Sequence, residues 1–135
     1  MLPEPHESGS PEKWLRYARS DLVIAQVTPT PEIMLEGLCF HAQQDVEKAL
    51  KAILITYGIE ISRTHSIRWL LDLLPPDLPV PDAGQDAAHL TDYAVMARYP
   101  GALEPVEDVE YREAVQVAEG VLAWDETPSQ INEKS

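Results

Sequence analysis

Residues 34–57 read MLEGLCFHAQQDVEKALKAILITY, and this stretch decides the fold. Its apolar side chains recur at intervals of three and four residues, which is the spacing of one face of an α-helix. They are Met34, Leu35, Leu38, Cys39, Ala42, Val46, Ala49, Leu50, Ile53, Leu54 and Tyr57. A stripe this wide can pack against more than one neighbour. The stretch therefore predicts a long helix with several packing partners.

Proline, glycine and short polar side chains mark where helices are expected to begin and end. Ser10 and Thr30 each precede a proline, and a hydroxyl N-cap followed by proline is a common helix start. Gly58 can adopt the left-handed conformation that ends a helix. These signals predict a first helix over residues 11–27 and a second, longer one over residues 31–57.

Three more helical segments follow, and a proline-rich loop divides them. Thr64 is expected to cap a short third helix, while four prolines within residues 75–81 exclude a helix there. Asp82 and Gln85 have the spacing of a capping box, which predicts the start of a fourth helix. The fifth helix is expected over residues 107–125.

The pattern as a whole predicts an all-α fold. No stretch shows the strict alternation of apolar and polar residues that marks a half-buried β-strand. Short connections between helices favour antiparallel neighbours, so we expect an up-and-down antiparallel bundle of four to five helices. One domain is expected over residues 11–125, between loose polar tails at residues 1–10 and 126–135.

The composition is that of one globular domain. The chain has 135 residues, 44% of them hydrophobic, and a domain of this length can bury a core without cross-links. Cys39 is the only cysteine, so no intramolecular disulfide can form. The first residues lack the basic and apolar regions of a signal peptide, and no apolar run reaches the roughly 20 residues of a transmembrane helix. A cytoplasmic protein without a membrane partner is expected.

The net charge of −13 is unevenly distributed. Residues 1–71 hold seven Lys and Arg against nine Asp and Glu, a net charge of −2, whereas residues 72–135 hold three against fourteen, a net charge of −11. Affinity for nucleic acid depends on cations that neutralise phosphates, so the acidic half makes a nucleic-acid partner an unfavourable hypothesis. This half either keeps the protein soluble as a solvated surface or receives a basic partner.

A row of polar side chains lies beside the apolar stripe of the second helix. His41, Gln44 and Lys48 follow one another at spacings of three and four, so they project from one side of the helix. They offer a ligand a titratable ring, an amide and a cation. Alternatively, His41 and Gln44 bond to neighbouring helices or to a second copy of the chain, while Glu47 and Lys51 form an ordinary ion pair.

The sequence carries no catalytic constellation that could work alone. No two of the four histidines lie three or four residues apart, so no metal site is expected on a helix. The sequence contains neither of the glycine-rich phosphate-binding motifs GxxxxGK[ST] and GxGxxG, and no serine or cysteine lies in a nucleophile motif. No cofactor is expected.

Three landmarks follow one another along the chain. They are residues 40–52 in the second helix, Thr64-His65-Ser66-Ile67 at the start of the third and Ala97-Arg98-Tyr99-Pro100 at the end of the fourth, and a last helix ending in Trp124 follows. In this order they resemble the HEPN domain, the nucleotide-binding domain of higher eukaryotes and prokaryotes. The resemblance covers about residues 11–125.

This resemblance implies a helical bundle that forms a homodimer. Some family members pair with a separately encoded minimal nucleotidyltransferase, as its substrate-binding subunit or as the toxin of a toxin–antitoxin pair. Toxic members are RNases that use an arginine and a histidine separated by four to six residues, joined across the dimer. No arginine in this chain is followed by a histidine at that spacing, so nuclease activity is disfavoured.

Three functions are compatible with these observations. The first, which we predict, is a homodimeric HEPN-type binding or regulatory subunit that partners a minimal nucleotidyltransferase and binds a nucleotide. The second is an RNase toxin that uses other residues, such as His41 or His65 with Arg98, and the third is a purely structural dimer without a ligand. The predicted ligand site consists of His41, Gln44 and Lys48, with Arg98 from the fourth helix, where its planar fork either holds a phosphate or caps the helix.

Overall fold

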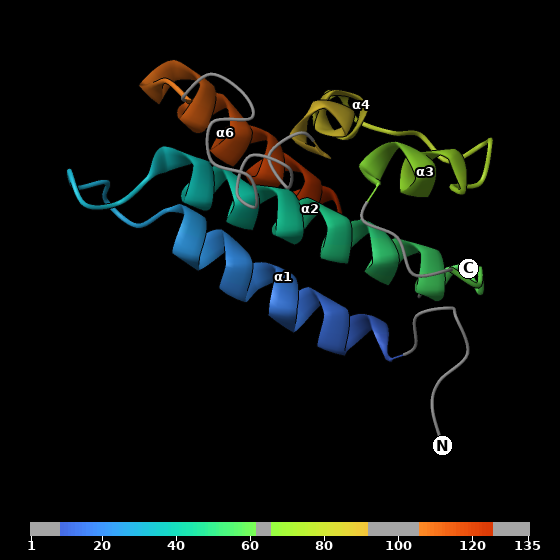
Figure 1. The fold of residues 1–135 in the computed structure, drawn as a ribbon. Helices are drawn as coiled ribbons and strands as arrows, with labels where there is room; N and C mark the ends of the chain where they lie inside the picture. The colour runs from blue at the N-terminus through green and yellow to red at the C-terminus, as the bar shows by residue number, and fades with distance from the viewer. Residues whose placement is uncertain (1–8, 62–65, 92–105, 126–135) are drawn as a thin grey trace.

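The computed structural model describes residues 9–61, 66–91 and 106–125. Within these ranges it contains five α-helices, one 3-10 helix and no β-strand, which confirms the predicted all-α fold (Figure 1). The elements are α1 (Pro11–Ala25), α2 (Leu35–Thr56), α3 (Ile67–Asp72), α4 (Asp82–Asp86), the 3-10 helix η1 (Ala87–Thr91) and α6 (Asp108–Asp125). No helix in these ranges is both long and apolar enough to cross a membrane. Apart from Gly9 and Ser10, the predicted tails lie outside the described residues.

The long helix α2 lies at the centre of the bundle and contacts α1, α3, η1 and α6, as its wide apolar stripe predicts. α1 runs antiparallel to it (Figure 1). The start of α6 lies beside the start of α2. The backbone N–H of Val106, two residues before α6, donates a 2.8 Å hydrogen bond to Oε2 of Glu36 in the first turn of α2. α6 therefore runs in roughly the same direction as α2, and the shorter helices α3, α4 and η1 lie between them in the chain.

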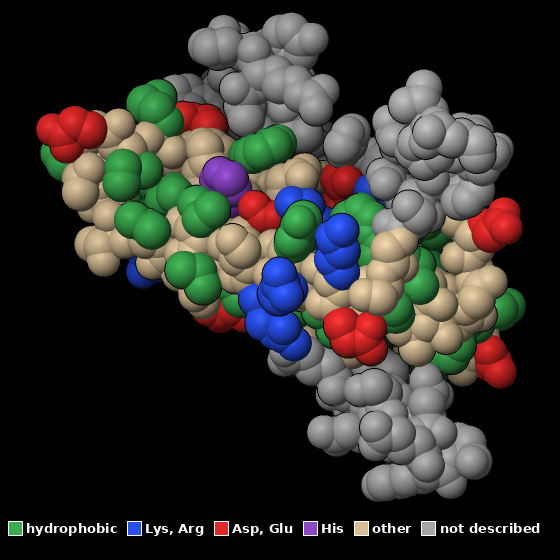
Figure 2. Space-filling model, turned by 90° about the horizontal axis from the view of Figure 1, so that it is seen from below, with side chains coloured by type: hydrophobic (Ala, Val, Ile, Leu, Met, Phe, Trp, Pro, Cys, Tyr) green, Lys and Arg blue, Asp and Glu red, His purple; other side chains and the backbone are tan. Residues whose placement is uncertain are grey.

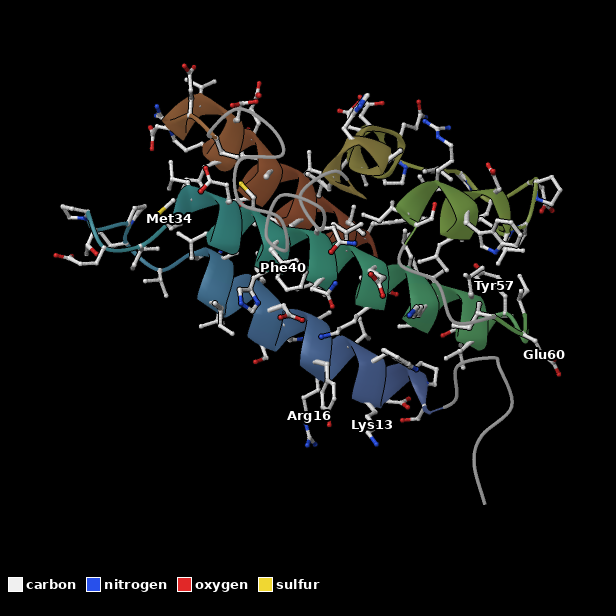
Figure 3. All side chains as sticks on the ribbon, in the orientation of Figure 1. Lys13, Arg16, Met34, Phe40, Tyr57 and Glu60 are labelled. Atoms are coloured by element: carbon white, nitrogen blue, oxygen red, sulfur yellow. The ribbon has the colours of Figure 1, made fainter. Side chains whose placement is uncertain are left out.

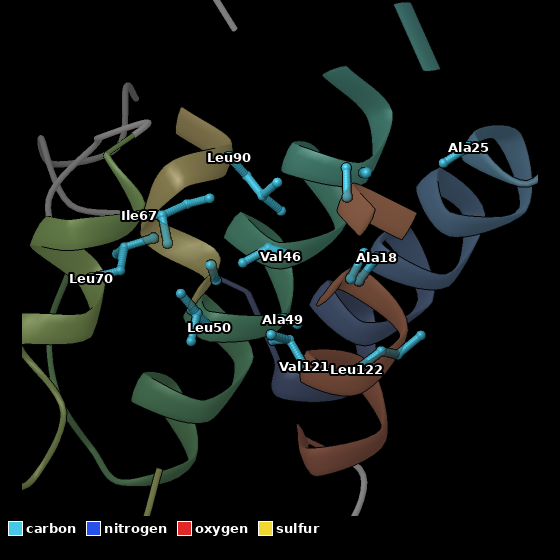
Figure 4. Close-up of a cluster of buried hydrophobic side chains, with 14 of the residues drawn as sticks. Ala18, Ala25, Val46, Ala49, Leu50, Ile67, Leu70, Leu90, Val121 and Leu122 are labelled. Carbon is cyan, nitrogen blue, oxygen red and sulfur yellow. The ribbon is translucent and has the colours of Figure 1, made fainter. Parts of the chain in front are cut away.

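The hydrophobic core surrounds α2. It includes Ala18 of α1, Val46, Ala49 and Leu50 of α2, Ile67 and Leu70 of α3, Leu90 of η1, and Val121 and Leu122 of α6 (Figure 4). Each large aliphatic side chain in this set contributes roughly 1.5–3 kcal/mol through burial. Cys39 is fully buried in the same core, and burial raises the pKa of its thiol to about 12, as fits a small core residue.

Local chemistry fixes the start of α1 and the end of α2 as predicted. The Ser10 hydroxyl accepts a hydrogen bond from the backbone N–H of Lys13 at 3.1 Å, and proline occupies the first helical position. At the other site Gly58 has a φ of 72°, and the N–H groups of Gly58 and Ile59 donate to Ile55 and Leu54 at 2.9 Å. These two hydrogen bonds form a Schellman motif, which ends α2.

The predicted start of α2 is wrong. Thr30 and Pro31 begin a turn, closed by a 3.0 Å hydrogen bond from the Ile33 N–H to the Thr30 carbonyl, and the helix starts four residues later at Leu35. Proline fits the second position of a β-turn as well as the first position of a helix, because both have the same φ. The N-cap is Met34, whose side chain makes no capping hydrogen bond.

The third and fourth helices differ from the prediction in their N-terminal caps, and the fourth also in its length. The N-cap of α3 is Ser66, whose hydroxyl accepts from the Trp69 N–H at 3.2 Å, and the predicted cap Thr64 lies outside the described residues. The predicted capping box of α4 is wrong, because Asp82 is already inside the helix and Gln85 donates to the Val80 carbonyl instead. The predicted single fourth helix becomes α4 and η1 in the described residues.

α4 and α6 pack at a glycine. A Cβ atom built on Gly120 of α6 would lie 2.6 Å from the Cβ of Ala83, so only glycine allows this approach. On the facing side, a Cβ on Gly84 would lie 2.7 Å from Val80 Cγ1 and 3.6 Å from Trp124. The absence of a side chain at these two positions lets the short helix α4 lie close to the last turns of α6.

Candidate functional site

The predicted polar row on α2 meets a carboxylate from α1. Asp21 Oδ1 lies 3.0 Å from His41 Nδ1, and Asp21 Oδ2 accepts a hydrogen bond from Lys48 Nζ at 2.6 Å. One carboxylate thus holds both groups, with one oxygen each. We call Asp21, His41 and Lys48 the α1–α2 polar cluster.

The antiparallel packing of α1 on α2 explains the position of Asp21. It lies three residues after Ala18 and four before Ala25, and all three side chains are buried against the bundle. Asp21 therefore occupies a position on the buried stripe of α1, and its carboxylate lies against α2. His41 and Lys48 lie seven residues apart, two turns along α2, so Asp21 can bond to both.

The outer parts of this cluster are accessible to a ligand. The side chain of Asp21 is only 10% exposed, whereas that of His41 is 33% exposed and that of Lys48 is 22% exposed. Phe40 packs edge-on against the His41 ring, with 5.5 Å between the ring centroids. The imidazole is thereby held by a carboxylate at Nδ1 and by an aromatic ring at its side, and no described residue bonds to Nε2, so this nitrogen can face a ligand.

Gln44 does not join this cluster. Its amide nitrogen donates to Gln43 Oε1 at 2.8 Å and lies 3.4 Å from Glu47 Oε1. Glu47 also accepts from Gln43 Nε2 and from Lys51 Nζ, each at 3.1 Å. The predicted pair of Glu47 and Lys51 is confirmed, but both side chains are buried, so it is a core ion pair and not an ordinary surface one.

Asp45 is a buried carboxylate that sequence reasoning did not single out. It is fully buried on α2, and neither of its carboxylate oxygens has a hydrogen-bond partner among the described residues. Its pKa is raised from 3.8 to about 8, first by burial and then by the nearby charges of Asp21 and Asp125, while Lys48 partly opposes the shift. Asp45 is therefore mainly protonated at neutral pH.

The fourth predicted site residue, Arg98, lies outside the described residues, as does His65. Among the described residues the structure thus brings together His41 and Lys48, adds Asp21 and turns Gln44 to a separate network. No group of three or more His, Cys, Asp or Glu side chains in the described part of the chain could hold a metal ion.

The α1–α2 polar cluster has two chemical capabilities. The Lys48 ammonium has three donors, of which Asp21 uses one, so it can also bind an anion. A hydrogen bond between Asp21 and Nδ1–H of His41 leaves Nε2 able to accept a proton or, when protonated, to donate to an anion. The arrangement fits an anionic ligand at the surface of α1 and α2.

A separate cavity of about 570 Å³ lies between the α4–η1 segment and α6. Its lining includes the acidic side chains of Asp86, Glu110 and Glu113, together with His89. Of the predicted ligand residues, those that the structure describes (His41, Gln44 and Lys48) do not line it. Its acidic lining disfavours a phosphate, so the polar cluster remains the candidate site.

The sequence profile of the HEPN domain matches residues 11–127. Two crystal structures are similar: TT1696 from Thermus thermophilus, at 34% identity and a TM-score of 0.71 over 86% of this chain and 95% of that one, and ST0689, an archaeal HEPN homologue, at 30% identity and a TM-score of 0.69 over 90% and 98%. None of the curated proteins compared with the chain is significantly similar to it.

Proposed function

Because this chain belongs to the HEPN domain family, we propose that it is a binding or regulatory subunit. It forms a homodimer, engages a minimal nucleotidyltransferase and binds a nucleotide through His41 and Lys48 on α2. The observation that carries the ligand site is the bridging of these two side chains by Asp21, at 3.0 and 2.6 Å. Arg98 remains a proposed addition to the site, and Gln44 a proposed residue at its edge.

The charge distribution supports an anionic ligand on this side of the molecule. Seven of the ten Lys and Arg residues lie in the first 71 residues, so α1 and α2 repel a phosphate less than α4 and α6 do. The cations of α1 include Lys13 and Arg16, which are exposed (Figure 3). A contact between Lys48 and a phosphate is charge-assisted, about twice as strong as a neutral hydrogen bond.

We expect the wild type to bind AMP weakly and Lys48→Ala to bind it several-fold more weakly. One charge-assisted contact at a partly exposed site contributes on the order of 1 kcal/mol, roughly a fivefold change in affinity. Titration calorimetry of the purified chain measures the dissociation constants, and circular dichroism confirms that the variant is folded. Arg68→Ala removes an exposed cation from α3 and serves as the control. A wild type that does not bind AMP at millimolar concentration contradicts the ligand site.

The surface near the end of α1 supports contact with another protein. Val23, Ile24 and Val27 are exposed large hydrophobic side chains, and so is Met34 just before α2. Figure 2 shows hydrophobic side chains gathered over one half of this face, beside Lys and Arg side chains. Contiguous exposed apolar side chains mark interaction surfaces in soluble proteins. We propose that a second copy of the chain covers them.

The purified protein is expected to be a dimer in light scattering at micromolar concentration. A specific contact would bury roughly 1,000 Å² or more, and a charge at its centre would oppose it. Ile24→Glu is therefore expected to give a monomer, while Val109→Glu, at an exposed hydrophobic position on α6, leaves the dimer intact. A monomeric wild type would contradict the proposal.

Pull-down from lysate should recover a nucleotidyltransferase, whereas growth arrest on expression of the chain alone would favour the RNase toxin.

A further inference from the structure

We infer that Tyr17 of α1 is the platform on which the base of the nucleotide stacks. This inference rests on the proposed function, since it assigns the part of the ligand that the polar cluster does not contact. Tyr17 lies four residues before Asp21, so the two side chains are neighbours on α1. Lys48 Nζ lies 5.9 Å from the centroid of the Tyr17 ring and 2.6 Å from Asp21. The same lysine therefore joins an aromatic ring to the proposed phosphate site.

α1 and α2 meet in an antiparallel register that repeats one kind of pair. Trp14 and Tyr17 of α1 face Lys51 and Lys48 of α2, and the distance from Lys51 Nζ to the Trp14 ring centroid is 5.2 Å. The pair of Trp14 and Lys51 belongs to the core, because Lys51 is buried and Trp14 is partly buried. The pair of Tyr17 and Lys48 lies at the surface, because 48% of Tyr17 is exposed. The exposed ring of Tyr17 is therefore accessible to a ligand that also contacts Lys48.

A nucleotide consists of an aromatic base and an anionic phosphate joined by a sugar, and this surface offers a separate contact for each of the two. Its base is a flat aromatic ring that can stack on tyrosine, and such stacking is tolerant of the identity of the base. Its phosphate is an anion that Lys48 and His41 Nε2 can bind. Asp21 contacts neither part and is a positioning residue, because it lies one helical turn from Tyr17 on α1 and holds both His41 and Lys48 of α2.

The test compares AMP with ribose 5-phosphate, which has the same sugar and phosphate and no base. The wild type is expected to bind AMP more tightly by at least about fivefold, the lower end of what one base stacked on an aromatic side chain gives. Tyr17→Ala should abolish this difference and leave the affinity for ribose 5-phosphate nearly unchanged. Tyr17→Phe should retain the difference, because stacking needs the ring and not the hydroxyl.

Two controls separate stacking from a structural effect. Trp69→Ala removes an exposed aromatic side chain from α3, away from the cluster, and should change neither affinity. Lys48→Ala should weaken both ligands. Equal binding of AMP by Tyr17→Ala and the wild type would overturn the inference, and so would an equal loss for both ligands in Tyr17→Ala. If the wild type binds ribose 5-phosphate as tightly as AMP, the phosphate site stands and the stacking role fails. Binding of neither ligand overturns both proposals.

Discussion

Replacing Glu47 with alanine is expected to lower the free energy of unfolding by about 3–5 kcal/mol, because it removes the carboxylate that pairs with a buried lysine. Glu47 Oε2 lies 3.1 Å from Lys51 Nζ, and the two side chains are only 3% and 2% exposed. Gln43 and Gln44 also donate to Glu47, so its removal affects three donors at once. A buried ammonium that loses its carboxylate keeps most of its desolvation cost.

Chemical denaturation measures this loss, and the chain provides a matched control. Asp108 and Arg112 form an ion pair with the same spacing on α6, at 2.6 Å, but their side chains are 61% and 66% exposed. Asp108→Ala should therefore cost no more than about 1 kcal/mol. The double variant Glu47→Met/Lys51→Met should lose less than Glu47→Ala, because it leaves no buried ammonium without the Glu47 carboxylate. Equal small losses in Glu47→Ala and Asp108→Ala would show that burial does not set the strength of these pairs.

Helix boundaries were predictable where the decisive chemistry is local. The Ser10 hydroxyl bonds to a backbone group three residues later, and Gly58 closes α2 through carbonyls no more than five residues away. Both interactions depend on neighbours in sequence alone. The pair Thr30-Pro31 is also local, but it fits a turn and a helix equally well. Whether a helix follows is decided by packing, which the sequence pattern does not contain.

The candidate site was predictable on one helix only. The spacing of three and four places His41 and Lys48 on one side of α2, and the structure confirms that they lie together. Spacing does not reveal which α1 residue lies opposite, so Asp21 was missed. The available signal was a carboxylate at the buried stripe position between Ala18 and Ala25. Gln44 was placed on the correct side, but its amide turns to the nearby oxygens of Gln43 and Glu47.

The same reasoning explains why Asp45 was not predicted as a special residue. In sequence it is one more charge on an amphipathic helix. In the structure, the charges of carboxylates from two other helices raise its pKa, namely Asp21 from α1 and Asp125 and Glu119 from α6, while the charge of Lys48 opposes them. Their combined effect depends on how α1 and α6 pack on α2. Only the three-dimensional arrangement raises the pKa of this carboxyl group.

Asp45→Asn is expected to stabilise the protein increasingly as the pH rises. Asp45 has a pKa of about 8 in the folded state against 3.8 for an unperturbed carboxyl. Between these values the folded chain binds more protons than the unfolded chain, so the stability of the wild type falls as the pH rises. The loss is complete above the folded pKa and is on the order of 5 kcal/mol. Asparagine resembles the protonated carboxyl in shape and does not titrate, so the variant lacks this loss.

Denaturation at pH 5 and at pH 8.5 checks the expectation, because the difference between variant and wild type cancels the other titrating groups. The gain in free energy of unfolding should be about 1–2 kcal/mol at pH 5, about one unit above the unperturbed pKa, and should grow by several kcal/mol at pH 8.5. Asp72→Asn removes an exposed carboxylate from α3 and should give a difference that is small at both pH values. A gain that is equal at the two pH values, or a variant less stable than the wild type at pH 8.5, would contradict a protonated Asp45. The result also bears on the candidate site, because a neutral Asp45 leaves Asp21 as the carboxylate that balances Lys48.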